Sequence, residues 1–133
     1  MIYLLDTPVF IWATLETSQL SKAVQQVITD KSNEICVSTV SFWEIALKVK
    51  RNTFSFNGID IKDFPKYARI MEFTILDLTA EETISFHELA VTHLHPDPLN
   101  RMVIWQAISQ DMILISRDGM LEPYKECGLK VLW

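Results

Sequence analysis

Short apolar runs alternate with amphipathic stretches along the whole chain. Each run is brief and bounded by polar or turn residues, which is typical of strands buried on both faces of a parallel sheet. The pattern predicts five strands, at residues 2–5, 35–37, 73–78, 112–115 and 129–132.

The stretches between these runs carry apolar side chains at helical spacing. Several begin at capping residues, including Ser21, Thr79 and Asp97, and Pro98 suits the first helical position because a proline lacks the N–H that is unpaired there. Helices are expected at residues 7–15, 21–30, 41–48, 61–71, 79–91 and 98–108, with a loop at residues 53–58. Helices between buried strands predict an α/β fold with a mostly parallel sheet of about five strands, covered by helices on both faces.

Size and composition indicate one domain, residues 1–133. The chain has 133 residues, of which 49% are hydrophobic and 22% charged, an ordinary globular balance. Its net charge of −5 argues against broad electrostatic affinity for nucleic acid, so any such contact must be local or carried by metal ions. Cys36 and Cys127 have neither zinc-like nor disulfide-framework spacing. Asp6 interrupts the apolar N-terminus and no apolar run is long enough for a membrane span, so a cytoplasmic protein is expected.

Polar side chains collect where the predicted strands end. Asp6 ends the first strand, and Asp118 follows the fourth. Asp97 and Asn100 begin the helix that leads into the fourth strand, and Glu44 lies in the helix after the second. In parallel α/β folds, ligands bind beyond the carboxyl ends of the strands. These residues are therefore candidates for one shared site.

Each candidate also has a purely structural interpretation. Asp6 and Asp97 can be helix caps, and Asp118 can be a polar turn residue. Ser41 and Glu44 have the spacing of a capping box. Together, however, clustered carboxylates would repel one another without a cation. Oxygen ligands of this kind suit Mg²⁺, with Mn²⁺ as the alternative, and such ions activate water and neutralise phosphodiesters in nucleases.

Basic residues add a candidate nucleic-acid surface, and aromatic residues a candidate surface for association with another protein. Lys48 and Arg51 lie late in the helix that carries Glu44, and Arg101 and Arg117 neighbour the proposed acids, so all four are candidates for binding nucleic-acid phosphates. Their alternative interpretation is as solvated charges that complement helix dipoles. Seven phenylalanines and four tryptophans are many for this length. Five of these aromatic side chains cannot all be assumed to fit one small core: Phe10, Trp12, Trp43, Phe54 and Phe56. Of these, Phe10 and Trp43 are expected in the core.

The motifs also occur in a recognisable order. They are LLDT at 4–7, VSTVSFWEIALK at 37–48, HPDPLNR at 95–101, ISRD at 115–118 and the final LW at 132–133. This series resembles that of PIN-domain ribonuclease toxins of the VapC type, over essentially the whole chain. The resemblance implies a PIN fold, a metal-dependent endoribonuclease and the toxin half of a type II toxin–antitoxin pair. It also implies a VapB-like antitoxin that blocks the acidic pocket, a groove for an antitoxin helix, and a homodimer.

The family's four acidic positions correspond to Asp6, Glu44, Asn100 and Asp118. Asp97 matches the first Asp of the family's Asp-Pro-x-Asp motif, and Arg101 matches the basic residue that follows it. Two residues depart from the pattern: Pro8 stands where many relatives have His, and Asn100 stands in place of an acid. An amide keeps a carbonyl oxygen for coordination but loses a negative charge and cannot accept a proton as a carboxylate does.

Other functions fit the residues less well. An aspartyl-nucleophile phosphotransferase needs a second acid two residues after the first, where Pro8 stands, and Asp77 and Lys130 do not complete a receiver-domain set. His87, His93 and His95 lack clear zinc spacing and are expected at the surface or on the approach to a helix. The alternative that remains is a catalytically weak or silent PIN domain, which would act as a module that binds antitoxin or RNA.

Overall fold

A computed structural model describes residues 1–51, 56, 58–90 and 95–133. Within these ranges, one sheet has the strand order β3-β2-β1-β4-β5, and all neighbouring strands are parallel. The strands are β1 (Ile2–Leu5), β2 (Glu34–Ser38), β3 (Thr74–Leu76), β4 (Ile113–Ile115) and β5 (Lys130–Leu132). The predicted α/β fold with five parallel strands is confirmed.

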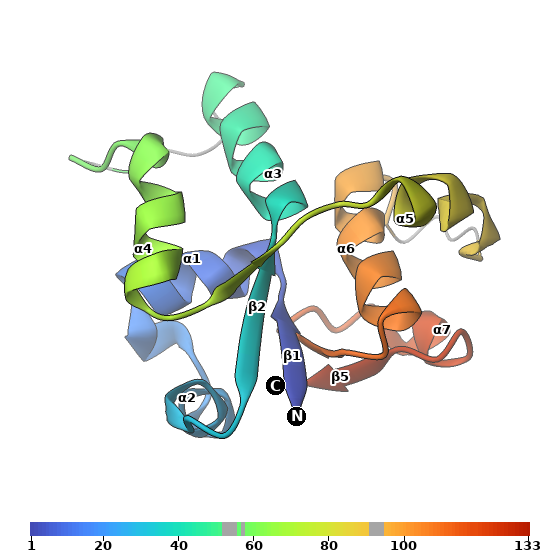
Figure 1. Ribbon diagram of the computed structural model, residues 1–133, viewed down its shortest axis with the longest axis horizontal. Coiled ribbons are helices and arrows are strands. Elements are labelled where there is room, and N and C mark those ends of the chain that lie inside the picture. Colours follow the sequence, from blue (N-terminus) through green and yellow to red (C-terminus); the bar gives the residue numbers. More distant parts are fainter. Residues whose placement is uncertain (52–55, 57, 91–94) are drawn as a thin grey trace.

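Helices follow most of the strands and cover the sheet on both sides (Figure 1). The α-helices are α1 (Thr7–Leu15), α2 (Lys22–Thr29), α3 (Thr39–Lys50), α4 (Phe64–Ile70), α5 (Ala80–Ser85), α6 (Pro98–Ser109) and α7 (Glu122–Lys125). Short 3₁₀ helices are η1 (Thr17–Gln19), η2 (Ile61–Asp63) and η3 (Phe86–Glu88). In Figure 1, α1, α2 and α4 lie on one side of β1 and β2, and α5 and α6 lie on the other.

Alternation along the central strand sends apolar side chains to both faces of the sheet. In β1, Tyr3 and Leu5 belong to the cluster that includes residues of α1, α2 and α4, whereas Leu4 belongs to the cluster with α6 and α7. Side chains of successive strand residues point to opposite faces, so a strand covered on both sides must be apolar throughout. This is why the strands read as continuous apolar runs in the sequence.

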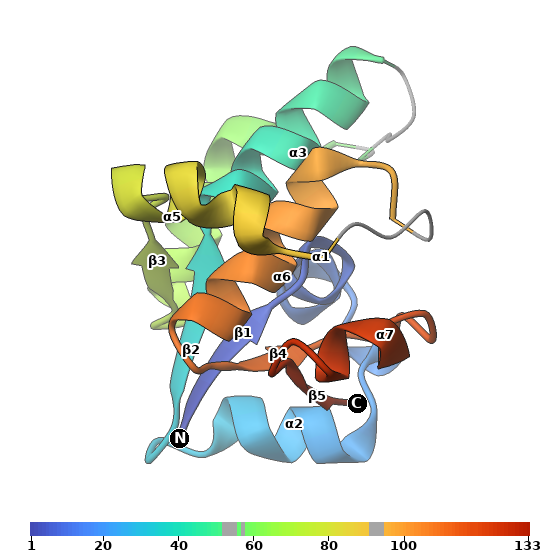
Figure 2. The ribbon, with the colours of Figure 1, turned by 90° about the vertical axis from the view of Figure 1, so that its right-hand side faces the viewer.

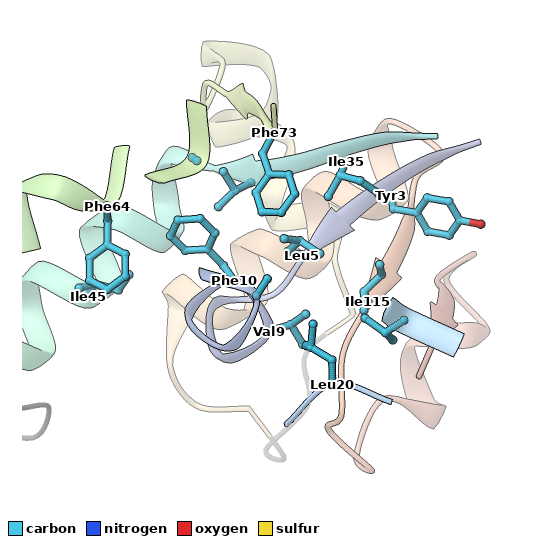
Figure 3. Packing of buried hydrophobic residues seen from close by; sticks show 14 residues of the cluster. Tyr3, Leu5, Val9, Phe10, Leu20, Ile35, Ile45, Phe64, Phe73 and Ile115 are labelled. Atoms are coloured by element: carbon cyan, nitrogen blue, oxygen red, sulfur yellow. The ribbon is translucent and has the colours of Figure 1, made fainter. Parts of the chain in front are cut away.

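Phe10 is the aromatic centre of the first cluster, as expected. Its side chain is fully buried, and its ring lies 5.4 Å from that of Phe42 and 5.8 Å from that of Phe64, measured between centroids. Figure 3 shows Phe10 between Leu5 and Phe64. The expectation for Trp43 is wrong, because this side chain is 55% exposed. The buried face of α3 carries residues 40, 41, 44 and 45, which leaves position 43 turned toward solvent.

Three predicted helices have different bounds. Helix α3 begins at Thr39 with Ser38 as its N-cap, so the expected capping box between Ser41 and Glu44 is wrong. Residues 61–63 form a 3₁₀ turn before α4, and the helix expected at 79–91 ends at Ser85 and continues as η3. The capping box at the start of that helix, between Thr79 and Glu82, is present.

Two short elements, η1 and α7, were not predicted, because three or four residues are too few to show a helical period. The predicted loop at 53–58 lies largely outside the described residues, and Phe54 and His93 lie wholly outside them. In the part of the chain that the structure describes, none of the helices combines the length and the apolar character that crossing a membrane requires.

The order of the strands creates a crevice between β1 and β4. From β1 the chain proceeds outward through β2 to β3, then returns to the other side of β1 to form β4 and β5. The register pairs Leu5 with both Val37 and Ile115, so β1, β2 and β4 end at one edge. Such a reversal point is where open α/β sheets bind ligands.

Candidate functional site

A cavity of about 510 Å³ opens at this edge of the sheet. Its lining comes from the starts of α1 and α6, the middle of α3 and the turn after β4. The lining residues are Asp6, Thr7, Pro8, Trp12, Glu44, Lys48, Asn100, Val103, Arg117 and Asp118. All four residues at the family's acidic positions therefore face one cavity, which we call the acidic cavity.

Asp6 is fixed where β1 passes into α1. Its backbone N–H donates to the carbonyl of Ile115 in β4 (3.1 Å), which extends the strand pairing by one residue. Its carboxylate Oδ1 accepts a hydrogen bond from the N–H of Val9 (3.0 Å) and so caps the helix. The helix cap that the sequence indicated is therefore present, and the other carboxylate oxygen of Asp6, Oδ2, takes no part in it.

Burial raises the pKa of Asp6 to about 6. That value already includes smaller upward effects from the negative charges of Glu44 and Asp118 and the opposite effect of hydrogen bonds with Ser116 and the N–H of Val9. A bound cation would relieve the repulsion between these like charges in a poorly solvated site.

Glu44 reaches the cavity from the second turn of α3. The residue is buried, and its Oε1 lies 3.0 Å from the Nζ of Lys48, one turn further along the helix. Two buried side-chain hydrogen bonds fix the start of α3: Thr7 in α1 donates to Ser41 (2.9 Å), and Ser38 donates to Gln106 in α6. The starts of α1 and α3 and the middle of α6 are therefore tied together beside the cavity.

Asp118 is held on both of its carboxylate oxygens. Oδ1 accepts from the N–H of Met120 (2.8 Å), and Oδ2 lies 2.6 Å from Nε2 of His95. Burial raises the pKa of Asp118, but the hydrogen bonds from His95 and Met120, with the charge of His95, outweigh it and hold this pKa below its usual value. The carboxylate thus stays ionised at the mouth of the cavity.

His95 is the site residue that sequence reasoning missed. His95 does lie on the approach to a helix, two residues before the cap of α6, but it is not at the surface: the ring is 5% exposed and packs against Tyr124 with centroids 5.3 Å apart. Its Nδ1 is buried without a hydrogen-bond partner among the described residues. Because an ionised carboxylate can only accept, Nε2 of His95 carries the proton in the hydrogen bond to Asp118.

Asn100 and Arg117 complete the lining of the cavity. Asn100 lies in the first turn of α6, where the helix dipole favours negative charge, yet it contributes an uncharged amide. The guanidinium of Arg117 lies 5.7 Å from the ring centroid of Trp12, an arrangement that holds a positive charge at the rim.

Three further candidates lie outside the acidic cavity. Asp97 caps α6 by accepting from the N–H of Leu99 (2.9 Å). Asp97 and Arg51 instead line a second cavity of about 500 Å³, which we call the Trp43 cavity. The guanidinium of Arg101 lies 5.1 Å from the ring centroid of Phe86, and its Nη2 donates to the carbonyl of Ala90 (3.5 Å).

The donor set of the acidic cavity fits a hard divalent cation in its chemistry. Carboxylate oxygens of Asp6, Glu44 and Asp118, with the amide oxygen of Asn100, are the ligands that Mg²⁺ and Mn²⁺ prefer. Among the residues that the structure describes, no three acidic, histidine or cysteine side chains already stand close enough to hold a metal. Glu44 and Asp118 are paired with Lys48 and His95 instead, so coordination would require them to share or exchange these partners.

The sequence matches the PIN-domain family over residues 3–126, and the chain belongs to this family. Proteins of this family are generally nucleases, and they commonly use divalent metals. The fold is similar to a chain in the crystal structure of VapBC2 from Rickettsia felis bound to a DNA fragment from its promoter (TM-score 0.66, 17% identity, covering 99% of this chain and 98% of that one). It is equally similar to a chain in the structure of FitAB bound to an IR36 DNA fragment (TM-score 0.66, 16% identity, covering 99% and 94%). A comparison with curated protein sequences gives no match.

The bond from His95 to Asp118 predicts an effect on metal affinity. His95→Phe keeps an aromatic ring against Tyr124 but removes the donor that orients the carboxylate, so Mn²⁺ affinity measured by calorimetry should fall about tenfold to a hundredfold. His95→Gln, whose amide can donate from a similar position, should recover most of the loss. The matched control is His87→Phe at an exposed histidine, which should bind Mn²⁺ as the parent does. Equal affinity in His95→Phe and the parent would contradict this orienting function.

The raised pKa of Asp6 predicts a pH-dependent loss of stability in the metal-free protein. Between the ordinary pKa of 3.8 and the folded value of about 6, the folded chain binds more protons than the unfolded chain, so stability falls as pH rises through this window. Asp6→Asn still caps α1 but does not ionise. Relative to the parent, it should gain about 2 kcal/mol in the free energy of urea unfolding between about pH 4 and pH 7. If the difference in unfolding free energy between Asp6→Asn and the parent does not change with pH, the raised pKa of Asp6 is refuted.

Proposed function

We propose that this protein is a metal-dependent endoribonuclease and the toxin of a type II toxin–antitoxin pair. The observation that carries the proposal is the acidic cavity, where Asp6, Glu44 and Asp118 meet at the reversal point of a parallel sheet. Membership of the PIN family supports nuclease activity, and the VapC-like motifs support the toxin assignment. The proposal takes residues 1–133 as one PIN domain and Mg²⁺ as the cofactor, with Mn²⁺ as the alternative.

In this proposal the three carboxylates hold the cation, and Asn100 contributes its amide oxygen. A bound divalent ion supplies an activated water and neutralises charge that develops on the phosphodiester. Lys48 and Arg117 line the same cavity and can hold the negatively charged backbone beside the acids. This arrangement would allow a protein of net charge −5 to act on a polyanion through a local contact.

The proposed partners are a cognate VapB-like antitoxin, RNA and a second copy of the chain. The similar structures are those of VapBC2 and FitAB, which supports an antitoxin partner. An apolar cavity of about 210 Å³ between α3 and α4, lined by Phe42, Ile45 and Phe64 among others, supports docking of an apolar helix face. The homodimer rests on the VapC-like motifs and is checked by light scattering.

Cleavage of RNA tests the proposal directly. The parent protein, freed of antitoxin, should cut single-stranded RNA in the presence of Mn²⁺ or Mg²⁺ and should stop when the metal is chelated. Asp6→Ala should abolish cleavage, because it removes a carboxylate at the centre of the cavity, while circular dichroism should show the parent fold. An Asp6→Ala protein that cuts RNA at the parent rate would exclude this site.

A second candidate function is a catalytically silent binding module, and Asn100 is the observation that favours it. If position 100 is a ligand, Asn100→Asp should raise both Mn²⁺ affinity and cleavage rate, the rate by about tenfold to a thousandfold, because a preorganised site regains a charged group. Asp97→Asn is the matched control: Asn caps a helix as Asp does, so metal binding should not change if Asp97 acts only as a cap. Unchanged affinity and rate in Asn100→Asp would favour the binding module.

A further inference from the structure

Trp43 is unusual among the large apolar side chains because it is exposed beside the acidic cavity. Its side chain is 55% exposed, and it precedes the buried Glu44 by one residue. Trp43, Leu47 and Arg51 are four residues apart in turn, so they form one stripe along α3. Glu44 and Lys48 form the neighbouring stripe, which faces the acidic cavity.

The Trp43 cavity lies between this stripe and the segment that enters α6. Helices α3 and α6 pack side by side, as the two ribbon views show (Figure 2). The opposite wall consists of Pro96, Pro98 and Leu99, and both prolines are exposed. The cavity is thus lined by an aromatic side chain from α3 and by proline rings from the segment that enters α6, with Arg51 on the same stripe as Trp43.

The two cavities are adjacent. Glu44 and Lys48 line both of them, so a chain that passes over these two side chains enters the Trp43 cavity from the acidic one. An aromatic plane flanked by cations is the combination that binds single-stranded nucleic acid, where bases stack on the ring and phosphates contact the charges. Bases in a duplex are already stacked on one another, so the occupant must be an unpaired nucleotide.

We propose that the Trp43 cavity is a base-binding subsite for single-stranded RNA, next to the phosphodiester held in the acidic cavity. In it, Trp43 provides the stacking plane, the proline wall limits the space to a flat ring, and Arg51 contacts the following phosphate. The subsite rests on the proposed nuclease function and specifies its substrate as an unpaired stretch of RNA.

A second copy of the chain is the competing occupant, and the lining of the cavity argues against it. Four charged side chains, Glu44, Lys48, Arg51 and Asp97, border the cavity, whereas the centres of protein–protein interfaces are depleted in charge. A nucleotide presents a ring to the apolar plane, a phosphate to Lys48 and Arg51, and hydrogen-bond donors to the carboxylates, and so matches this mixed lining better than an apolar protein surface does.

The test measures RNA affinity in an Asp6→Asn background, so that the RNA stays intact. The probe is a short single-stranded RNA that carries a fluorescent base analogue. Trp43→Ala should weaken binding about fivefold to a hundredfold, while Trp43→Phe, which keeps an aromatic plane, should lose much less. The matched control is Ile70→Ala, which removes another exposed apolar side chain from α4 and should bind as the parent does.

A second readout separates stacking from charge. Arg51→Ala should reduce the slope of log affinity against log salt by about one, whereas Trp43→Ala should leave this slope unchanged. In the protein with Asp6 intact, Trp43→Ala should raise KM for RNA and leave kcat within about twofold.

Three results would overturn the subsite. Equal RNA affinity in Trp43→Ala and the parent background would overturn it alone and leave the proposed nuclease intact. Loss of affinity accompanied by conversion of a dimer to a monomer in light scattering would assign Trp43 to an interface between copies. Failure of the parent to bind or to cut RNA would overturn the subsite and the proposed function together.

Discussion

The parallel pairing of β1 with both β2 and β4 is the constraint on which the rest of the structure depends. Because Leu5 is in register with Val37 and Ile115, the chain leaves all three strands at one level of the sheet. Asp6, Ser38 and Ser116 are the next residues along these strands, and each lies where a helix or turn begins. The positions of the carboxylates follow from this register and from the lengths of the helices that precede or follow them.

Opposing electrostatic demands meet at this edge. Capping α1 and stabilising negative charge near helix starts favour ionised carboxylates, whereas burial and mutual repulsion oppose them. The structure resolves the conflict unevenly: Asp6 has a raised pKa, Asp118 has a lowered pKa because of His95 and Met120, and Glu44 is paired with Lys48. Asn100 reduces the repulsion at the fourth position. The metal-free cavity is therefore held together by internal partners that a cation would partly replace.

Much of the fold was predictable from the sequence, because strands buried on both faces must be apolar throughout and the caps at Ser21, Thr79 and Asp97 are local signals. The grouping of Asp6, Asn100 and Asp118 was also predictable, since strand ends and the starts of helices that lead into strands share one edge of a parallel sheet. Whether Glu44 joins them depends on how α3 packs, which the structure shows. The start of α3 was not, because Ser38 and Ser41 both suit an N-cap and a tertiary hydrogen bond from Thr7 uses Ser41.

Side chains whose environment depends on loop paths were beyond sequence reasoning. His95 meets Asp118 across 23 residues, and no local pattern indicates this pairing. Its one available signal was its position two residues before the cap Asp97, which brings it to the same edge as the acids. Trp43 is a large apolar residue of the kind usually found in the core. The burial of Glu44 and Ile45 on one face of α3, however, turns position 43 outward. Both cases concern orientation, which the three-dimensional packing decides.

The central claim is that Asp6, Glu44 and Asp118 together form a cation site. Anomalous diffraction from crystals grown with Mn²⁺ tests it most directly, because the position of the ion is observed without reference to activity. The account predicts one anomalous peak or two in the acidic cavity, within about 2.5 Å of carboxylate oxygens of Asp6 and Asp118. A saturating Mn²⁺ concentration that leaves this cavity without a peak, or an ion bound only elsewhere, would contradict it.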